Sequence, residues 1–304
     1  MRTWARTSGL RAKANANGVD REPGQMTTSR RPARIHSSTN VAQNVACTVL
    51  TGTLTGMALL TMDQRGDGPE LMWLHGFTQT RETAEPFLSI LAGNHRMLTP
   101  DLPGHGASGD VRGSLTEAAA MVQELRPPSP SSLGGYSFGG RVALHLALAY
   151  PESVSRLILL STSMGIANDD ERVQRRRADE ELAQRIRDDG VVSFHRYWRS
   201  LSLFSSVSDD AWGSRSEDGE GLASSLERAG AGTQEYLAEQ LPTLTMPTLL
   251  LYGSLDHRYA EAAHAMAALL PRASVVAIEG AGHAAHLERP DVVAEAIEVF
   301  LATA

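Results

Sequence analysis

The chain is short of cysteine, of lysine and of long apolar runs. Its 304 residues include one cysteine, Cys47, and one lysine, Lys13. A single cysteine excludes a disulfide within the chain, and this cysteine usage gives no indication of an oxidising compartment. No apolar stretch approaches the roughly 18–20 residues that a membrane-spanning helix needs. We therefore expect a cytoplasmic protein without a membrane partner.

Positive charge is also scarce in most of the chain. Residues 1–44 hold eight basic and two acidic residues, whereas the rest of the chain holds 20 basic and 33 acidic residues. The body therefore has a net charge of −13, which makes it a poor candidate for binding nucleic acid. A body this acidic has to place arginines locally if its ligand is an anion.

The first 44 residues differ in character from the rest. They are polar, show no helical or strand periodicity and lack the apolar segment of a secretory signal. This composition predicts a disordered N-terminal extension. Two alternatives stay open for the segment: a transit peptide, whose composition it resembles, and a translation start at Met26.

Residues 45–304 alternate short apolar runs with helical patterns, which predicts an α/β fold: a mostly parallel sheet flanked by helices. Strands are expected in an opening hairpin at 47–64 and in 70–77, 95–106, 131–137, 154–162, 247–256 and 273–283. Helices are expected over 113–127, 138–150, 260–271 and 290–302. Residues from about 165 to 240 lack strand-like runs and are rich in charge, which predicts an inserted helical cap.

A loop of small residues holds a serine between a predicted strand and a predicted helix. Residues 135–139 read Gly-Tyr-Ser-Phe-Gly, which fits the G-x-S-x-G pattern of a nucleophile elbow with Ser137 at its centre. The small flanking residues permit the sharp turn that lifts the serine hydroxyl clear of the sheet. The alternative is an ordinary turn serine, because five-residue matches also arise by chance.

Three further segments supply partners for this serine in the chain order typical of α/β-hydrolases. Phe77 follows a predicted strand that ends in Leu-His-Gly, and its backbone N–H would join that of Phe138 in an oxyanion hole. Asp256 and His283 each follow a later predicted strand, and the strand ends of an open α/β sheet converge on one site. Ser137, Asp256 and His283 are therefore the predicted catalytic triad.

Each of these partners also has a structural interpretation. Asp256 would cap a loop, and His283 would be an ordinary buried histidine. We expect His286 to have a structural role or to support a catalytic residue, and His105 to order a loop rather than to catalyse. The histidines near residue 283 lack the clustered ligands of a metal site, so we expect no metal and no cofactor. Dehalogenases and epoxide hydrolases use an aspartate nucleophile, and Ser137 occupies that position here.

Arg141 stands one turn after the serine, where a cation is unfavourable. The N-terminus of a helix repels positive charge at a cost of roughly 0.3–1 kcal/mol. Residues i and i+4 share a helix face, so we expect Arg141 to point towards the same pocket as Ser137. A substrate carboxylate would satisfy the guanidinium with a bidentate pair. An ion pair with an acidic residue of the cap is the structural alternative.

The predicted cap holds a second arginine on its inward face. One stripe of its first helix has i, i+4, i+7 and i+11 spacing: Arg175, Asp179, Leu182 and Ile186. The far end of the stripe is apolar, so Arg175 is expected on the buried side, with Asp179 to orient it. We expect four other arginines of this helix to face solvent: Arg172, Arg176, Arg185 and Arg187.

An aromatic cluster follows this helix. Phe194, Tyr197 and Trp198 have i, i+3 and i+4 spacing, which is typical of packing within the cap. Tyr197 and Trp198 also suit the wall of a pocket, and both interpretations stay open.

Several of these motifs together resemble one family. The segments LHGF, DLPGHGAS and GAGHAAHLERP are shared with many α/β-hydrolases. More specific are GYSFGGRVAL with its arginine, the cap run GIANDDERVQRRRADEELA, and FHRYWRSLSLF, a trio that generic esterases lack. Over about residues 70–302 the chain resembles the 2-succinyl-6-hydroxy-2,4-cyclohexadiene-1-carboxylate synthases, α/β-hydrolase-fold lyases of menaquinone biosynthesis. The N-terminal extension is not part of the family pattern.

The resemblance implies roles for individual residues. It implies the same triad: Ser137, Asp256 and His283. The ligand-binding residues that it implies are Arg141, Arg175, Tyr197, Trp198 and, in a stretch that is shorter here than in the family, Arg215.

The resemblance also implies a reaction and a small anionic metabolite as the partner. The substrate would be 2-succinyl-5-enolpyruvyl-6-hydroxy-3-cyclohexene-1-carboxylate, from which the enzyme would eliminate pyruvate. His283 would draw the proton from Ser137, and the activated serine would act as a general base. The amides of Phe77 and Phe138 would stabilise the developing enolate oxygen. Three substrate carboxylates would account for the arginines in and under the cap.

Two other interpretations stay open. A serine hydrolase, either an esterase or a C–C bond hydrolase, would use the same triad on a carboxylate-bearing small molecule. Arg141 and Arg175 argue against a neutral ester but not against another acidic substrate. The second alternative is a non-catalytic ligand receptor on a hydrolase scaffold, against which the complete triad argues. The sequence predicts no oligomeric state.

Overall fold

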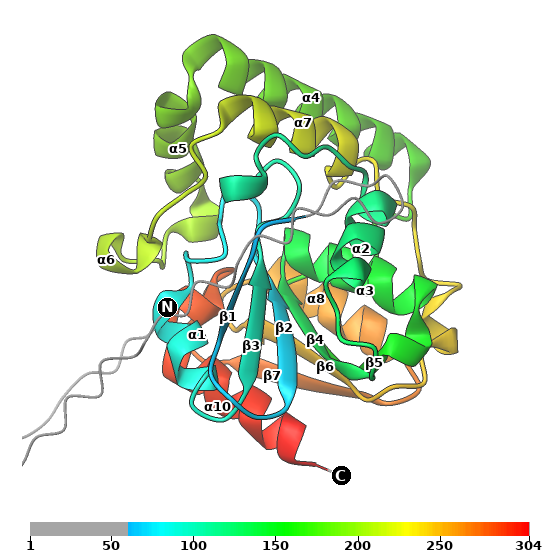
Figure 1. The fold of residues 1–304 in the computed structure, drawn as a ribbon. Coiled ribbons are helices and arrows are strands. Elements are labelled where there is room, and N and C mark those ends of the chain that lie inside the picture. The colour runs from blue at the N-terminus through cyan, green and yellow to red at the C-terminus, as the bar shows by residue number, and fades with distance from the viewer. Residues whose placement is uncertain (1–59, 304) are drawn as a thin grey trace, which may run out of the picture. The chain divides into compact units, whose positions relative to one another are not determined.

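A mostly parallel seven-stranded sheet is the centre of the computed structural model, which describes residues 60–303 (Figure 1). Its strand order is β1-β3-β2-β4-β5-β6-β7, with β1 antiparallel to β3. The strands are β1 Met62–Arg65, β2 Glu70–Leu74, β3 Arg96–Pro100, β4 Ser131–Tyr136, β5 Val154–Leu160, β6 Thr248–Gly253 and β7 Ala273–Ile278. This architecture confirms the predicted fold class. The predicted extension at 1–44 and the first part of the predicted hairpin at 47–64 lie outside the described residues.

The strands at the centre of the sheet are apolar on both faces because helices cover both. Leu71 and Met72 are neighbours in β2, so their side chains point to opposite faces, and both are fully buried. The parallel register pairs Leu74 of β2 with Gly135 of β4. This pairing brings the loop after β2 beside the loop that holds Ser137.

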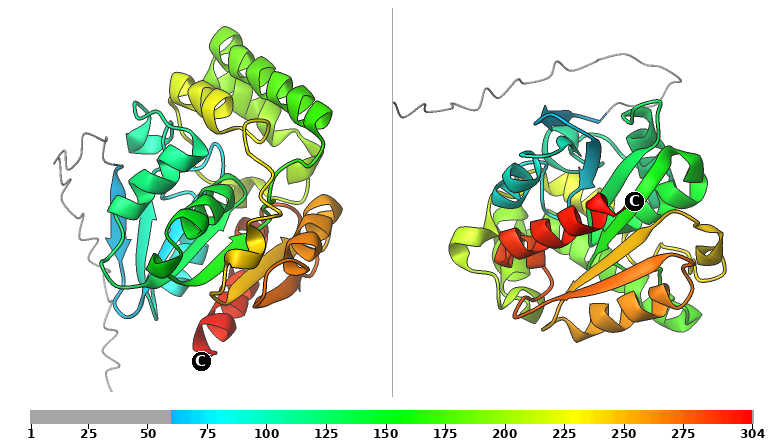
Figure 2. Two further views of the ribbon diagram at one scale, coloured as in Figure 1. Left: turned by 90° about the vertical axis from the view of Figure 1, so that its right-hand side faces the viewer. Right: turned by 90° about the horizontal axis from the view of Figure 1, so that it is seen from below.

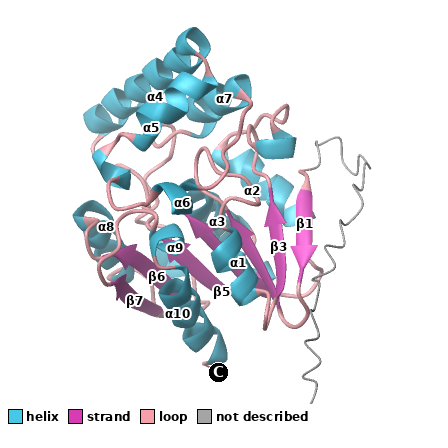
Figure 3. Ribbon diagram, turned by 90° about the vertical axis from the view of Figure 1, so that its left-hand side faces the viewer, coloured by secondary structure: helices cyan, strands magenta, loops and turns pink. Residues whose placement is uncertain are grey.

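The helices of the main domain form two layers. One layer packs its apolar residues against the sheet from α2 Leu115–Glu124, α3 Phe138–Ala149 and α8 His257–Ala267. The other consists of α1 Glu85–Leu91, α9 Ala285–Glu288 and α10 Pro290–Ala302, seen in front of the strands in Figure 3. The C-terminal α10 is red in Figure 2, where it lies beside the sheet.

A set of helices inserted between β5 and β6 covers the carboxyl ends of the parallel strands (Figures 1 and 3). These helices are α4 Asp169–Asp189, α5 Val191–Arg199, α6 Asp209–Trp212 and α7 Gly219–Ala229. They have a small core of their own, formed by Ala183, Ile186, Phe194, Leu222, Ala223 and Leu226. The predicted cap segment is therefore helical and lies over the edge of the sheet where strand-end loops meet.

Three helices differ from the sequence-based expectation, one of them the four-residue α9, which was not predicted. Helix α1 was not predicted, because it is short and its only signals are Pro86 in the first turn and three buried apolar residues. Helix α8 begins at His257, three residues earlier than predicted, because Asp256 caps it by accepting a hydrogen bond from the N–H of Tyr259 (3.4 Å). The earlier start brings Arg258 into the first turn of α8.

Candidate active site

Ser137 occupies a strained turn between β4 and α3. Its backbone has φ +51° and ψ −107°, in a region that non-glycine residues rarely adopt. The turn is held by the Ser137 N–H, which donates to the Leu160 carbonyl (2.9 Å), and by the Thr162 hydroxyl, which donates to the Ser137 carbonyl (2.9 Å). A methyl group on Gly139 would collide with the carbonyl oxygen of Leu74. The glycine therefore lets α3 approach β2 closely enough to form the elbow.

The three predicted triad residues lie within hydrogen-bonding distance of one another. The Ser137 Oγ lies 3.0 Å from His283 Nε2, and His283 Nδ1 lies 2.7 Å from the Asp256 carboxylate. The side chains of His283 and Asp256 are 2% and 5% exposed, so water does not compete for their hydrogen bond. The serine hydroxyl thus has a base beside it, and the base has an orienting carboxylate.

Aromatic rings fix the orientation of the His283 imidazole. Its ring lies 4.4 Å from that of Tyr259, 5.2 Å from that of Tyr136 and 6.1 Å from that of Phe204, centroid to centroid. Tyr136 is fully buried, and burial raises the pKa of its hydroxyl well above the usual value. It is therefore a neutral wall of the site rather than a proton carrier at physiological pH.

The two predicted oxyanion-hole residues lie on neighbouring loops at the serine. Phe138 is the first residue of α3, and Phe77 follows the end of β2; both line the cavity that contains Ser137. Among residues 60–303, neither of their N–H groups donates to another protein group. Two free donors beside a nucleophile are the arrangement that stabilises a developing oxyanion.

A buried hydrogen-bond network holds the loop that carries Phe77. Gln79 Oε1 accepts from the Gly76 N–H (3.0 Å), and Gln79 Nε2 lies 3.4 Å from His286 Nε2. On the other side of the loop, His75 Nε2 accepts from the Leu102 N–H (3.0 Å). Burial lowers the pKa of His286 to about 3, so the imidazole stays neutral and can accept from Gln79.

His105 also orders a loop, as the sequence suggested. Its Nδ1 lies 2.9 Å from the Pro103 carbonyl, and its ring stacks on Phe138 at 5.4 Å. Burial lowers its pKa to about 3. His105 and His286 therefore support the two loops around the serine without reaching it.

The cavity at the serine has a volume of about 340 Å³ and a cationic wall. The arginines on its wall are Arg141, Arg175 and Arg258, and no acidic residue of the described range 60–303 lines it. Apolar side chains, including Leu182, Leu201, Leu203 and Leu226, form much of the remainder. The cavity therefore suits a small molecule that carries several negative charges on an apolar frame.

Arg141 reaches this cavity and also contacts the end of a cap helix. Its Nη1 donates to the carbonyl oxygen of Ala229, the last residue of α7, at 2.9 Å. Within residues 60–303 its guanidinium pairs with no carboxylate, so the ion pair considered as an alternative is not formed there. Burial lowers the pKa of Arg141 to about 10, and the guanidinium remains charged at neutral pH. Its full charge is available to a ligand.

Arg175 has the buried partner that its helical spacing predicted. Its Nε donates to Asp179 Oδ1 at 2.8 Å, and Asp179 Oδ2 accepts from the Gly232 N–H at 3.0 Å. The Asp179 side chain is 1% exposed, whereas that of Arg175 is 33% exposed. One edge of the guanidinium is thus fixed by Asp179, and the rest can face the cavity.

The structure separates the two cap aromatics. Trp198 lines the cavity and packs between the rings of Phe77 (5.3 Å) and Phe194 (5.6 Å). Tyr197 does not line the cavity, because its ring faces the guanidinium of Arg185, 3.8 Å from the ring centroid. Successive residues of a helix point about 100° apart, so only one of the pair can face the site.

Arg215 also lies outside the cavity wall. Its guanidinium stacks on the Trp212 ring at 3.8 Å, and burial lowers its pKa to about 10. Burial is the main cause of the raised pKa of Tyr136 and of the lowered pKa of His286; the charge of Arg215 partly opposes the first shift and adds to the second. The structure therefore does not bring Arg215 to the ligand space beside Ser137.

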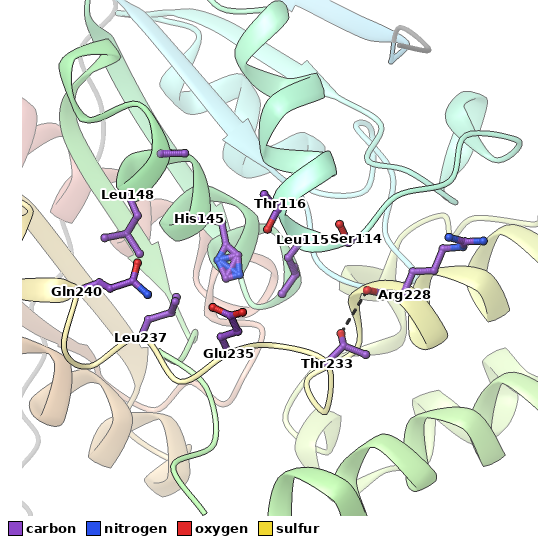
Figure 4. Close-up of a pocket in the computed structure, with 11 residues that line it drawn as sticks. Ser114, Leu115, Thr116, His145, Leu148, Arg228, Thr233, Glu235, Leu237 and Gln240 are labelled. Atoms are coloured by element: carbon purple, nitrogen blue, oxygen red, sulfur yellow. Dashed lines mark hydrogen bonds between the residues drawn. The ribbon is translucent and has the colours of Figure 1, made fainter. Parts of the chain in front are cut away.

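A second cavity, of about 280 Å³, lies further along α3 (Figure 4). It contains His145, one turn beyond Arg141, together with Glu235 and Arg228. Burial lowers the pKa of His145 to about 4, and the charge of Arg141 lowers it as well. Ser114 also lines this cavity, but within residues 60–303 no hydrogen bond joins the side chains of Ser114, His145 and Glu235, so the first cavity is the candidate active site.

Several residues of the cavity wall were missed by the sequence analysis, among them Ser225, Arg258 and Tyr259. Arg258 had the same signal as Arg141: each is a cation near the start of a helix that directly follows a predicted catalytic residue. Ser225 and Tyr259 had no local signal, because their place on the wall depends on tertiary packing.

In residues 60–303 no helix is both long and apolar enough to cross a membrane. The same residues contain no cluster of three or more histidine, cysteine, aspartate or glutamate side chains suited to holding a metal ion.

The sheet, the elbow serine and its two partners define an α/β-hydrolase. A model of the alpha/beta hydrolase family matches residues 71–296. The chain therefore belongs to the alpha/beta hydrolase family and, within it, to the 2-succinyl-6-hydroxy-2,4-cyclohexadiene-1-carboxylate synthases.

The second assignment rests on individual relatives. The synthase of that name from Photorhabdus laumondii is 30% identical over 246 residues, which cover 77% of this chain and 86% of that protein. The solved structure of MenH from S. aureus has a TM-score of 0.74 and 28% identity, and covers 79% of this chain and 97% of that one. A malate-bound esterase from Thermogutta terrifontis matches with a TM-score of 0.69 and 27% identity, over 80% of this chain and 92% of that one.

Proposed function

We propose that the protein is a lyase that eliminates pyruvate from 2-succinyl-5-enolpyruvyl-6-hydroxy-3-cyclohexene-1-carboxylate. The product would be 2-succinyl-6-hydroxy-2,4-cyclohexadiene-1-carboxylate, the compound in the names of the relatives. The observation that carries the proposal is the combination of a triad at hydrogen-bonding distance with a cavity wall to which the described residues contribute three arginines and no acid. The proposed substrate has three carboxylates. We also propose that the enzyme acts in the cytoplasm.

The names of the substrate and product define the bonds that change. The ring double bond at carbon 3 is replaced by double bonds at carbons 2 and 4. A proton therefore leaves carbon 2, next to the succinyl ketone, and the enolpyruvyl oxygen leaves carbon 5. The departing enolate takes a proton to become pyruvate. The reaction consumes no water and needs no acyl-enzyme.

The residues of the site have distinct roles in this proposal. His283 Nε2 accepts the Ser137 hydroxyl proton while the serine oxygen removes the proton at carbon 2. Asp256 stabilises the imidazolium that forms, through its hydrogen bond to His283 Nδ1. The free N–H groups of Phe77 and Phe138 would bind the ketone oxygen as it becomes an enolate. Arg141 and Arg175 would hold carboxylates, and Trp198 would pack on the ring.

A direct assay tests this function. The purified protein is incubated with the proposed substrate, and the release of pyruvate is followed. Rapid release with no hydrolysed ester product supports the lyase. Absence of pyruvate, together with turnover of short-chain or dicarboxylate esters, would support the second candidate.

The second candidate is a serine hydrolase for a carboxylate-bearing ester. It is favoured by one observation: the triad has the geometry of a nucleophile with its base and orienting acid, as an esterase requires. An acyl-enzyme would form on Ser137 in that case. Trapping of a covalent adduct by mass spectrometry separates it from the lyase, which forms none.

A further inference from the structure

Arg258 stands in the first turn of α8, where a cation is unfavourable. Helix α8 begins at His257 and is capped by Asp256, so Arg258 is its second residue. Positive charge at this position opposes the helix dipole, as it does at Arg141 in α3. The two arginines that follow the triad serine and the triad acid thus share the same electrostatic conflict, and both line the same cavity.

No acidic side chain relieves the conflict at Arg258. Among residues 60–303, its guanidinium forms no ion pair and no hydrogen bond, and its central carbon lies 5.9 Å from the centroid of the Tyr259 ring. The Asp256 carboxylate next to it is occupied: one oxygen faces His283 Nδ1, and the other accepts from the Tyr259 N–H. The positive charge of Arg258 is therefore not paired with a carboxylate of residues 60–303.

The position of Arg258 differs from that of the other two arginines. Arg141 and Arg175 are partly buried and bonded to cap groups, Ala229 and Asp179. Arg258 is exposed and lines the cavity itself, next to Tyr259, whose ring lies 4.4 Å from that of His283. It therefore stands at the solvent side of the cavity, on the wall formed by α8 rather than by the cap.

We infer that Arg258 is a third carboxylate-binding residue of the site. The inference rests on the proposed function, because the proposed substrate carries three carboxylates and the wall offers three guanidinium groups. Arg141 and Arg175 bind two of the carboxylates from α3 and from the cap. Arg258 binds the remaining one from α8, and the ligand charge neutralises the cation at the start of that helix.

An exposed cation contributes more to the binding of an anionic substrate than to the chemical step. Its attraction for an anion is screened by salt, and it acts equally on the substrate and on the transition state. Replacing Arg258 should therefore raise KM and leave kcat nearly unchanged. It should also flatten the decline of kcat/KM with ionic strength, because steering by this charge is lost.

The kinetic test compares three variants of the full chain with the unmodified protein in the pyruvate-release assay. Arg258→Gln should raise KM by about 3- to 10-fold with kcat within about twofold, as expected for loss of an exposed charge-assisted contact. Arg258→Lys should recover most of the loss, because capture needs the charge. Arg272→Gln is the matched control: it removes an exposed arginine before β7 that does not line the cavity, and its KM should not change.

A binding test does not depend on the reaction. Calorimetry with propane-1,2,3-tricarboxylate and with succinate compares a three-carboxylate probe with a two-carboxylate probe. The unmodified protein should bind the tricarboxylate more tightly, and Arg258→Gln should abolish that difference while leaving succinate binding unchanged.

The outcomes distinguish the inference from the proposed function. Equal or absent binding of the tricarboxylate, or an unchanged preference in Arg258→Gln, would overturn the role of Arg258. A fall in kcat at constant KM would also overturn it, because the residue would then act on the triad. If the unmodified protein releases no pyruvate but Arg258→Gln loses the tricarboxylate preference, the proposed function fails and the third carboxylate site stands.

Discussion

The Arg141 guanidinium donates a hydrogen bond to the carbonyl oxygen of Ala229, 2.9 Å away and 88 positions later in the chain. Ala229 ends α7, so its carbonyl is at the negative end of that helix dipole. Arg141 thus stands between the positive start of α3 and the negative end of α7. This contact offsets the unfavourable position of the cation and leaves its remaining donors for a ligand.

Removing Arg141 should impair catalysis more than folding. In Arg141→Ala, loss of a charge-assisted contact to a carboxylate should lower kcat/KM by about 10- to 100-fold. The free energy of unfolding should change by less than about 1 kcal/mol, because loss of the Ala229 hydrogen bond is offset by relief of the dipole conflict. Denaturant unfolding and pyruvate-release kinetics on the same sample check both numbers.

Two comparisons sharpen the Arg141 experiment. Arg141→Lys should recover only part of the activity, since an ammonium lacks the planar fork of donors. Arg177→Ala, which removes an exposed arginine of α4, should leave the kinetics unchanged. A destabilised Arg141→Ala protein with full activity would contradict the carboxylate-binding role.

The buried pair of Asp179 with Arg175 should contribute far more to the stability of the fold than an exposed pair on the same helix. Asp179→Asn turns an acceptor into a donor that faces Arg175, and it leaves a buried cation contact unsatisfied. We expect a loss of about 1–3 kcal/mol in the free energy of unfolding, together with a raised KM. The matched control is Asp189→Asn, which breaks the exposed pair with Arg185 (3.3 Å) and should cost about 0.5 kcal/mol or less. Equal effects of the two substitutions would show that burial of Asp179 has no energetic consequence.

The buried histidines make the fold sensitive to acid. Burial lowers the pKa of His105 and of His286 to about 3, whereas an unfolded histidine titrates near 6.5. The unfolded chain therefore binds protons first, so the stability that these histidines contribute is complete above pH 6.5. It is lost as pH falls from about 6.5 towards 3, by about 1.4 kcal/mol per pH unit for each histidine.

His286→Phe tests this linkage. Phenylalanine suits the aromatic surroundings, where the His286 ring lies 4.3 Å from that of Tyr136 and 5.9 Å from that of Phe87. Between pH 6.5 and 5, the free energy of unfolding of the variant should fall less steeply with falling pH than that of the unmodified protein. The difference in slope should correspond to the uptake of about one fewer proton on unfolding. Chemical denaturation at several pH values measures the slope. Identical slopes would mean that His286 does not remain neutral in the folded state.

Local patterns were enough to predict the triad and the inward face of the cap. The elbow motif and two strand ends identified Ser137, Asp256 and His283, because the carboxyl ends of parallel strands always meet at one edge. Helical periodicity placed Arg175 beside Asp179 in the same way. In each case the residues lie within one element or at a point defined by the topology.

Contacts between distant segments were not predictable. Nothing in the sequence indicates that Arg141 meets the carbonyl of Ala229, because any residue has a carbonyl. The choice between Tyr197 and Trp198 depends on the rotation of α5 against the sheet, which periodicity does not define. The place of Arg258 depends on where α8 begins. The helix begins at His257, three residues before the expected start, because Asp256 caps it there.

The rate of pyruvate release by Ser137→Ala, compared with that of the unmodified protein, tests the central claim most directly. The claim is that the Ser137 hydroxyl, activated by His283 at 3.0 Å, removes the proton that starts the elimination. The variant should bind the substrate with nearly unchanged affinity and release pyruvate at least about a thousand times more slowly, because the members of a triad act as a unit. A Ser137→Ala protein that releases pyruvate at the normal rate would contradict the claim.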